Sequence, residues 1–387
     1  MNSLVIINQK GMRRVQAGHP WVFKSDILEL GQFKSGDVVP VHSPDKKFLG
    51  QAFFNSQSQI TLRFLTRQKE PVDAHFWKKR LRDSIERRRP LLAEHDSMRL
   101  IFGESDLLPG LVVDQYKDVL VFQTLSAGMD RLKEELVSQF KELLQPSAII
   151  ERNDSPVRDL EGLIRQRGVI FGNLPPNFQI EVAGRHFFLD PIEGQKTGFF
   201  LDQAENYLAA ARFASGKALD VFCYQGGFSL SVASRVDEVL AIDSSATALE
   251  KLQANASLNG LTNIQTLEAN GFDFLRERQM AGELFDTIIL DPPPFVRNRK
   301  DKESGIRGYK EINLRAMKLL GPGGLLVTCS CSQNFTPELF GEMLVGAARD
   351  SKKETQVIEI RGAPADHPVL LTFPESSYLQ CWILRVL

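Results

Sequence analysis

The spacing of hydrophobic and polar positions changes near residue 194, and this change divides the chain. Before it, short strand-like runs are separated by turn-forming Gly, Pro, Ser and Asp residues, which is typical of small β-rich domains. After it, short apolar runs alternate with helical patterns, which is typical of a parallel sheet with crossover helices. The pattern therefore predicts β-rich N-terminal parts followed by a C-terminal α/β domain.

Residues 1–72 are expected to form a small β-barrel or β-roll. The strand-like runs lie at 5–8, 37–42, 48–54 and 59–64. The segments KGMRR (10–14) and GHPWVF (18–23) mix cations with aromatic side chains, which can hold a sugar–phosphate backbone while a ring stacks on a base. The candidate RNA-binding residues are Lys10, Arg13, Arg14, His19 and Trp21. Trp21 and Phe23 can equally be core residues of one strand, so both interpretations stay open.

Residues 73–190 are expected to combine a basic linker helix with a central α+β domain. The helix is predicted at 72–92, where apolar residues line one side and cations occupy much of the rest. Hairpin strands are predicted at 111–113 and 119–124, and a second helix at 131–144.

Residues 191–387 are expected to form the α/β domain. Its strands are predicted at 218–222, 238–242, 264–269, 285–290, 325–328, 355–360 and 379–386. Its longer helices are predicted at 245–258, 309–320 and 337–348. The helix at 309–320 is expected to stop at the GPGG segment, 321–324.

The segment LDVFCYQGG (219–227) follows the order strand, glycine turn, helix start. Such a turn lets backbone N–H groups approach a nucleotide-like ligand. Asp243, at the end of the next strand, can accept hydrogen bonds from both ribose hydroxyls of an adenosine-containing cofactor. A glycine turn after a strand can also be only a turn.

Two later strands run directly into the segments DPPPF (291–295) and CSCS (329–332). Ligands of an open parallel sheet bind outside the carboxyl ends of its strands, so these two segments, the glycine turn and the strand end at Asp243 are expected to face one crevice. Each has a purely structural explanation as well, because proline ends a strand and free cysteine is commonly buried. Four such segments in order on one sheet edge favour a binding site.

Composition narrows the class of protein. The 387 residues are 43% hydrophobic and 25% charged, as in ordinary soluble domains. No apolar stretch approaches the roughly 18 residues of a membrane helix, and the N-terminus lacks a signal-peptide pattern. Four cysteines without zinc-like spacing argue against a disulfide framework or a structural metal, so a cytoplasmic location is expected. Residues 1–100 carry a charge of +8 and the remainder −9, which indicates a phosphate-binding footprint or a solvated basic helix.

Assembled in order, these residues resemble the bacterial class I S-adenosylmethionine-dependent methyltransferases that modify cytosine C5 in 23S ribosomal RNA and carry an N-terminal PUA domain. The resemblance runs nearly end to end. Its motifs are GHPWVF (18–23), GESD (103–106), LPG (108–110), KTGFFLDQ (196–203), the glycine turn, DPP (291–293), GYKEIN (308–313), SCS (330–332) and DHP (366–368). It implies a seven-stranded, mostly parallel Rossmann-like sheet, S-adenosylmethionine as cofactor and 23S rRNA as partner. A homodimer stays one expectation for the oligomeric state.

The resemblance also implies the site, residue by residue. The expected cofactor-binding residues are Asp220, Phe222, Cys223, Gly226, Gly227, Asp243, Asn270 and Gln203. Cys331 matches the nucleophile position, and Asp291 is expected to hydrogen-bond the N3/N4 edge of the pyrimidine. Cys329 is an addition of this chain beside the nucleophile.

Several positions depart from the family pattern. Asn270 stands where relatives usually have an acid that contacts the adenine amino group, and its amide oxygen can still accept that bond. Pro294 stands where relatives often have Lys or Ala, and Ala204 where they often have Arg. The second thiol of related two-cysteine RNA enzymes is missing from the proline motif. These departures can alter substrate choice or cofactor affinity without altering the reaction.

The implied reaction needs a thiolate, because cytosine C5 is a poor nucleophile towards a methyl sulfonium. Thiolate attack at C6 makes C5 electron-rich, C5 takes the methyl group, and loss of the C5 proton expels the sulfur. The sequence does not identify the base that removes this proton, and Asp366, His367 and Glu375 are only guesses.

Two other functions compete with this reading. The DPPPF segment resembles the acid-Pro-Pro-aromatic motif of amino-group methyltransferases, in which Phe295 would stack on the base and no thiol is needed. The chain could instead be an RNA-binding protein with a vestigial methyltransferase fold. The intact glycine turn, Asp243, Asp291 and Cys331 count against that last reading.

Overall fold

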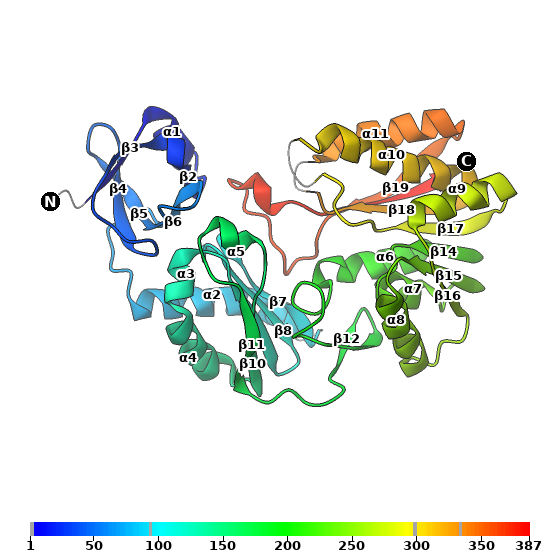
Figure 1. Ribbon diagram of the computed structural model, residues 1–387, viewed down its shortest axis with the longest axis horizontal. Coiled ribbons are helices and arrows are strands. Elements are labelled where there is room, and N and C mark those ends of the chain that lie inside the picture. Colours follow the sequence, from blue (N-terminus) through cyan, green and yellow to red (C-terminus); the bar gives the residue numbers. More distant parts are fainter. Residues whose placement is uncertain (1–3, 93–94, 297–299, 333–334) are drawn as a thin grey trace. The chain divides into compact units, whose positions relative to one another are not determined.

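The computed structural model describes residues 4–92, 95–296, 300–332 and 335–387. By their contacts the residues divide into two units, whose elements are labelled in Figure 1. Unit 1 comprises Met1–Ile180, Leu189–Phe199 and Asp366–Ser376, and unit 2 comprises Glu181–Phe188, Phe200–Ala365 and Ser377–Leu387.

Unit 1 begins with a six-stranded sheet in the order β2-β6-β5-β4-β1-β3. Its strands are β1 (Val5–Ile7), β2 (Trp21–Phe23), β3 (Ile27–Leu30), β4 (Val38–His42), β5 (Phe48–Phe54) and β6 (Ile60–Thr66). β1 pairs with β4 in parallel, and the other pairs are antiparallel. Buried valine, isoleucine, leucine and phenylalanine side chains form its core. The predicted β-rich N-terminal part is confirmed.

Helix α1 (Gln9–Gln16) was not predicted, because the KGMRR segment was read only as a cluster of cations. The Asn8 side chain caps this helix by accepting a hydrogen bond from the N–H of Gly11 at 2.9 Å. The buried side of α1 is small, with Gly11 and Val15 inside, so its cations lie on the other sides.

The second part of unit 1 is a five-stranded sheet in the order β11-β10-β9-β8-β7. Its strands are β7 (Ser97–Phe102), β8 (Leu111–Tyr116), β9 (Val119–Thr124), β10 (Ala148–Asn153) and β11 (Gln166–Gly172). Its helices are α2 (Ala74–Leu92), α3 (Ala127–Arg131), α4 (Lys133–Leu144) and α5 (Val157–Leu160). Residues of α2, α4 and β7 to β10 share one core. The predicted helix at 72–92 and the β8–β9 hairpin are confirmed, and the helix predicted at 131–144 is interrupted at Leu132.

Unit 2 contains a seven-stranded sheet in the order β16-β15-β14-β17-β18-β20-β19. Its strands are β14 (Lys217–Val221), β15 (Glu238–Asp243), β16 (Ile264–Glu268), β17 (Phe285–Leu290), β18 (Leu320–Ser330), β19 (Thr355–Arg361) and β20 (Gln380–Val386). The strands from β16 to β18 run parallel, and β20 is antiparallel to both of its neighbours. The predicted seven-stranded, mostly parallel sheet is confirmed.

Helices cover both faces of this sheet, as Figure 1 shows. On one face lie α6 (Ala204–Phe213), α7 (Gly227–Val232) and α8 (Ala246–Leu258), and on the other α9 (Gly271–Ala281), α10 (Lys302–Leu319) and α11 (Pro337–Ser351). Two short strands, β12 (Gln179–Val182) and β13 (Arg185–Phe188), form a separate pair. None of the helices in the described ranges combines the length and the apolarity that crossing a bilayer requires.

Helix α10 ends at Leu319, directly before the GPGG segment, so the predicted stop is confirmed to within one residue, whereas the helix start predicted at 309 and the strand start predicted at 325 are both too late. Helix α10 begins earlier, at Lys302, and the glycines lie inside β18, which begins at Leu320. Phe285 of β17 pairs with Leu320, and the register shifts before the next pair, Thr287 with Leu325. Pairing with a neighbouring strand therefore overrides a local turn signal.

Candidate active site

The parallel register brings four strand ends to one edge of the sheet in unit 2. Val221 of β14 pairs with Ile242 of β15 and with Leu290 of β17. Leu290 in turn pairs with Thr328 of β18. The segments that follow these strands therefore emerge side by side, as predicted, at the edge where open parallel sheets bind ligands.

The loop after β14 is held in a fixed conformation. Phe222 and Tyr224 have left-handed backbone angles, with φ of 70° and 49°, which non-glycine residues adopt only where their surroundings impose it. The N–H groups of Phe222 and Cys223 both donate to the carbonyl of Ile242, at 2.8 and 3.0 Å. The N–H of Tyr224 donates to Asp243 Oδ2 at 2.9 Å. The loop is therefore tied to β15 without any ligand.

Both glycines of the turn are required by packing. Gly226 has a φ of +94°, and a Cβ there would lie 2.8 Å from Leu252 Cγ. A Cβ at Gly227 would lie 2.4 Å from Tyr207 Cζ. The glycines thus allow α7 to approach α8 and α6 closely, a structural reason that adds to the role predicted from the sequence.

Asp220 is a buried carboxylate that is only half satisfied. The Ser229 hydroxyl donates to its Oδ2 at 2.5 Å, whereas no described residue hydrogen-bonds its Oδ1. Burial raises the pKa of Asp220 to about 7. An unpartnered buried oxygen at the glycine turn suits a ligand that brings its own N–H or O–H donor, such as the ammonium or hydroxyl groups of S-adenosylmethionine.

Asp243 and Asn270 follow neighbouring strands but are placed differently. Asp243 accepts the N–H of Ser245 at 3.0 Å in addition to that of Tyr224, and each of its oxygens keeps a lone pair for a ribose hydroxyl. The Asn270 oxygen caps α9, because it accepts the N–H groups of Phe272 and Asp273 at 3.0 and 3.3 Å. The amide oxygen expected to contact adenine is thus already engaged.

The two cysteines of the CSCS segment differ sharply. Cys329 lies within β18, is 0% exposed and pairs in register with Cys381 of β20. Burial and its contact with Cys381 raise the pKa of the Cys329 thiol well above the usual value. Cys331 lies just beyond the strand and is half-buried. Of these two thiols, only Cys331 combines exposure with a place at the strand edge.

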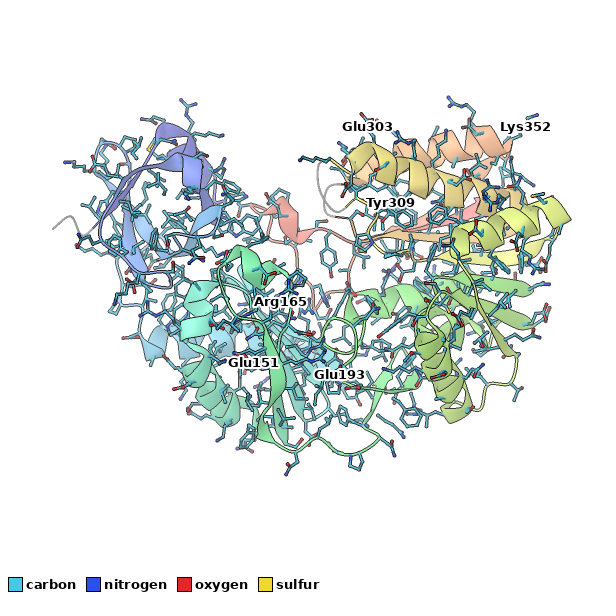
Figure 2. All side chains as sticks on the ribbon, in the orientation of Figure 1. Glu151, Arg165, Glu193, Glu303, Tyr309 and Lys352 are labelled. Carbon is cyan, nitrogen blue, oxygen red and sulfur yellow. The ribbon has the colours of Figure 1, made fainter. Side chains whose placement is uncertain are left out.

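Tyr309 of α10 packs beneath the segment that holds Cys331. Its hydroxyl lies 3.0 Å from the Ser332 hydroxyl, and Figure 2 labels the residue where α10 faces the sheet. Burial raises the pKa of Tyr309 to about 12, and the charge of Cys331 adds to this rise. The buried Tyr309 thus holds the side chain of Ser332, the residue that follows the nucleophile candidate.

Comparisons with known proteins agree with this geometry. Residues 5–67 match the model of the PUA-like domain, and residues 170–370 match that of the S-adenosylmethionine-dependent methyltransferases. The chain belongs to the S-adenosylmethionine-dependent methyltransferase family. Ribosomal RNA large subunit methyltransferase I of Shewanella denitrificans is 39% identical over 97% of each chain, and the protein of that name from Tolumonas auensis is 38% identical over 100% of each.

Solved structures confirm the fold of this methyltransferase. A protein from Streptococcus mutans, for which a SAM-dependent methyltransferase function has been suggested, superposes with a TM-score of 0.86 at 20% identity, over 100% of each chain. A structure in complex with SAH, for which a methyltransferase function has also been suggested, gives 0.87 at 21% identity, again over 100% of each chain. At this level of identity the likeness concerns the fold alone.

Phe295 of the methyltransferase's proline segment packs among other rings. Its centroid lies 4.7 Å from that of Tyr309, 5.5 Å from that of Phe272 and 6.4 Å from that of Phe222. These contacts join the segment after β17 to the loop after β14, to α9 and to α10. Phe295 therefore has a clear packing role in the site.

Trp21, predicted to bind RNA, is engaged within unit 1. Its indole N–H donates to Glu104 at 2.7 Å, and its ring lies 4.6 Å from that of Phe373. Arg63 stacks over the same ring and pairs with Glu104 at 2.7 Å. This arrangement favours the structural reading of Trp21 that the sequence left open.

The other RNA-binding candidates divide into two groups. His19 contacts Glu375 at 3.3 Å, and Arg14 forms an ion pair with Asp26. The exposed candidates on α1 are Lys10 and Arg13.

Asp366 and His367, the guesses for the base, lie in the packing of unit 1. His367 Nδ1 lies 2.7 Å from Asp366 Oδ1, and the N–H of Arg99 donates to Asp366 Oδ2 at 2.8 Å. Burial opposes ionisation of Asp366, but His367 and Arg99 outweigh it and lower the pKa of this carboxyl. Both residues are buried and belong to unit 1, where they support its structure.

Proposed function

We propose that this methyltransferase transfers a methyl group from S-adenosylmethionine to C5 of a cytosine in 23S rRNA through a covalent bond between Cys331 and C6. The observation that carries the proposal is the position of Cys331, a half-buried thiol directly beyond β18, beside the strand end that carries Asp291. The names of the relatives in Shewanella and Tolumonas support an RNA substrate from the large ribosomal subunit.

The residues around the glycine turn fit the cofactor, which supplies an electrophilic methyl group when it is bound. Asp220 Oδ1 would accept a hydrogen bond from a cofactor donor, and the turn at Gly226 and Gly227 would hold the cofactor beside it. Asp243 would accept hydrogen bonds from the ribose hydroxyls. The remaining contacts would come from residues that follow the ends of β14 and β16, and these are Phe222, Cys223 and Asn270.

In this mechanism Cys331 acts as the nucleophile and Asp291 binds the base. The Cys331 thiolate adds to C6, and the electron pair displaced from the C5–C6 double bond makes C5 nucleophilic. C5 then takes the methyl group as the bond from that methyl to the sulfonium sulfur breaks. A base removes the C5 proton, the electrons of the C5–H bond re-form the double bond, and the C6–S bond breaks to restore the thiolate. Asp291 accepts a hydrogen bond from the N4 amino group and stabilises the adduct.

Exposed cations on the PUA-like domain supply contacts to the RNA backbone. Lys10 and Arg13 are exposed on α1 and can pair with phosphates. The amino-group alternative gains no support, because the ring of Phe295 that would stack on the base packs among Phe222, Phe272 and Tyr309.

Tritium release tests this function directly. Purified protein is incubated with S-adenosylmethionine and unmodified 23S rRNA that carries tritium at cytosine C5. Release that vanishes in Cys331→Ala and persists in Cys329→Ala supports C5 transfer with Cys331 as nucleophile. Methyl incorporation without tritium release would instead place the methyl group on another atom and overturn the proposal.

A further inference from the structure

Gln203 joins Asn206 and Arg361 into a buried chain of hydrogen bonds that ends on Asp291. Gln203 Nε2 donates to Asp291 Oδ1 at 3.0 Å, and Asn206 Nδ2 donates to Gln203 Oε1 at 2.7 Å. Arg361 Nε donates to Asn206 Oδ1 at 3.0 Å. Gln203 and Asn206 are 2% and 0% exposed, so water does not replace these partners.

The donors and acceptors in this series of hydrogen bonds are fixed by its first member, Arg361. An amide has one oxygen that accepts and one nitrogen that donates, whereas a guanidinium only donates and a carbonyl only accepts. Arg361 therefore donates to the Asn206 oxygen, and the Asn206 nitrogen donates to the carbonyl of Gly362 at 3.1 Å. Asn206 must offer that same nitrogen to Gln203. Gln203 then has its own nitrogen left for Asp291.

Further contacts hold both ends of this series of hydrogen bonds in place. Arg361 Nη2 donates to Glu205 of α6 at 3.0 Å, and its Nη1 donates to Glu359 of β19 at 2.7 Å. At the other end, burial raises the pKa of Cys329, while a hydrogen bond from Gln203 acts in the opposite sense. The Gln203 nitrogen thus points towards the ends of β17 and β18.

We propose that Asn206 and Arg361 are positioning residues for methyl transfer, which act through Gln203 to hold the Asp291 carboxylate in one orientation towards the cytosine. The inference rests on the proposed function, in which Asp291 contacts the base. A donor fixed on Oδ1 favours the ionised carboxylate and prevents its rotation. Gln203 thereby serves Asp291 in place of the cofactor contact expected from the sequence.

Asn206→Asp tests the order of donors and acceptors in this series of hydrogen bonds, with almost no change in the shape of the side chain. The new carboxylate accepts from Arg361 but has no donor for Gln203, so the Gln203 amide rotates and turns its oxygen towards Asp291. Two acceptors in contact favour a proton on Asp291. We expect kcat to fall about 100-fold, KM for S-adenosylmethionine to stay within about twofold, and the acidic limb of the pH–rate profile to move about one unit higher.

The pH readout is the difference between the variant and the wild type, because Asp220, with a pKa of about 7, and the ionisation of Cys331 affect the acidic limb in both proteins. Tyr207 of α6 and Cys329 of β18 both sense the charge of Asp291, and burial raises the pKa of each well above its usual value. Neither group therefore titrates on the acidic limb. Arg361 and Glu205 lie further along the chain of hydrogen bonds and are unchanged in the variant.

Asn263→Asp is the matched control. Asn263 donates to the carbonyls of Ala233 and Val236 at 2.8 and 3.1 Å, and it precedes β16 at the opposite end of the strands. The same chemical change there removes the same kind of donor and lowers the melting temperature. It should leave kcat and the acidic limb unchanged.

Gln203→Met provides a second, independent variant. It removes the donor to Asp291 and retains the length of the side chain, so kcat should fall as in Asn206→Asp while S-adenosylmethionine still binds. A loss of cofactor affinity would assign Gln203 to the cofactor and overturn the inference.

The outcomes separate this inference from the proposed function. If wild-type protein methylates RNA without tritium release, the proposed function fails first. If the wild type releases tritium and Asn206→Asp keeps its kcat and its acidic limb, only the inference fails. A loss of activity that merely follows the folded fraction in thermal melts, with no movement of the acidic limb, would also overturn it.

Discussion

Two buried aspartates, Asp106 in unit 1 and Asp220 in unit 2, differ in how many hydrogen-bond partners their carboxylate oxygens have. They are 2% and 1% exposed. Asp106 accepts from Arg88 through both oxygens, at 2.6 and 2.7 Å, and also from the N–H of Phe102. Burial raises the pKa of Asp106, but these bonds outweigh it and lower the pKa overall. Asp220 has Ser229 on one oxygen and no described partner on the other, and burial raises its pKa to about 7.

The difference distinguishes a carboxylate whose oxygens are both engaged within its unit from one that still has an oxygen available to accept a hydrogen bond. Arg88 is itself saturated, because it also donates to Ser84 and to the carbonyls of Arg99 and Asp366. A buried ion of this kind is costly to disturb but has no capacity for a new partner. Asp220 destabilises its own unit and keeps that capacity, which is typical of binding sites.

The largest effect is expected from Arg88→Met, which leaves Asp106 buried without its main partner. We expect the free energy of unfolding to fall by about 3–5 kcal/mol, the usual cost of breaking a buried pair from one side. Denaturant unfolding of the full chain measures this. A loss below about 1 kcal/mol would place Asp106 with ordinary surface acids and remove the contrast with Asp220.

An intermediate effect of opposite sign is expected from Asp220→Asn. The folded-state pKa of Asp220, about 7, lies above the 3.8 of an unperturbed aspartate, so folded protein keeps a proton that unfolded protein releases. The contribution of Asp220 to stability is therefore present at low pH and is lost as pH rises through about 7. Without cofactor, the variant should be more stable than the wild type at pH 8, by on the order of 2 kcal/mol.

The same variant should bind S-adenosylmethionine about tenfold more weakly, because a neutral amide oxygen is a poorer acceptor than a carboxylate. Calorimetric titration at pH 8 measures the affinity, and unfolding between pH 4 and pH 8 measures the stability difference. Equal affinity together with an unchanged pH slope would show that Asp220 is a packing residue like its neighbours.

The smallest effect is expected from Arg87→Gln. Arg87 donates to Asp106 at 2.9 Å, as Arg88 does, but its side chain is 53% exposed. Water and salt screen such a contact, so the free energy of unfolding should fall by about 0–1 kcal/mol. A cost equal to that of Arg88→Met would mean that both arginines support Asp106 equally, which would contradict the assignment of Arg88 as its main partner.

Much of the fold was predictable from the sequence. β17 was predicted with its observed bounds, Phe285–Leu290, because an unbroken apolar run ends there at three prolines. β5 was predicted equally well at Phe48–Phe54. Prediction failed at the start of β18, where pairing with β17 decides the structure. Such pairing depends on residues far apart in the sequence, so the local residue pattern does not reveal it.

The candidate site was less predictable, because a sequence motif does not determine where each side chain points. Asp291 and Cys331 come from strand ends, and register alone brings them to one edge. Gln203 lies on the turn η3 (Leu201–Gln203), and only the three-dimensional structure shows that its amide meets Asp291 rather than open space. Asn206, three residues later, carried no motif signal. The spacing of two amides one helical turn apart was its only trace in the sequence.

A trapped adduct tests the central claim most directly. An RNA substrate with 5-fluorocytidine at the target position has no C5 proton to lose, so the C6–S bond cannot break after methylation. We predict a denaturation-resistant RNA–protein complex that requires S-adenosylmethionine and whose linked peptide carries the modified base on Cys331. The complex should form with Cys329→Ala and be absent with Cys331→Ala. Methylation of natural RNA by wild-type protein without any trapped complex, or a complex linked through Cys329, would contradict this account.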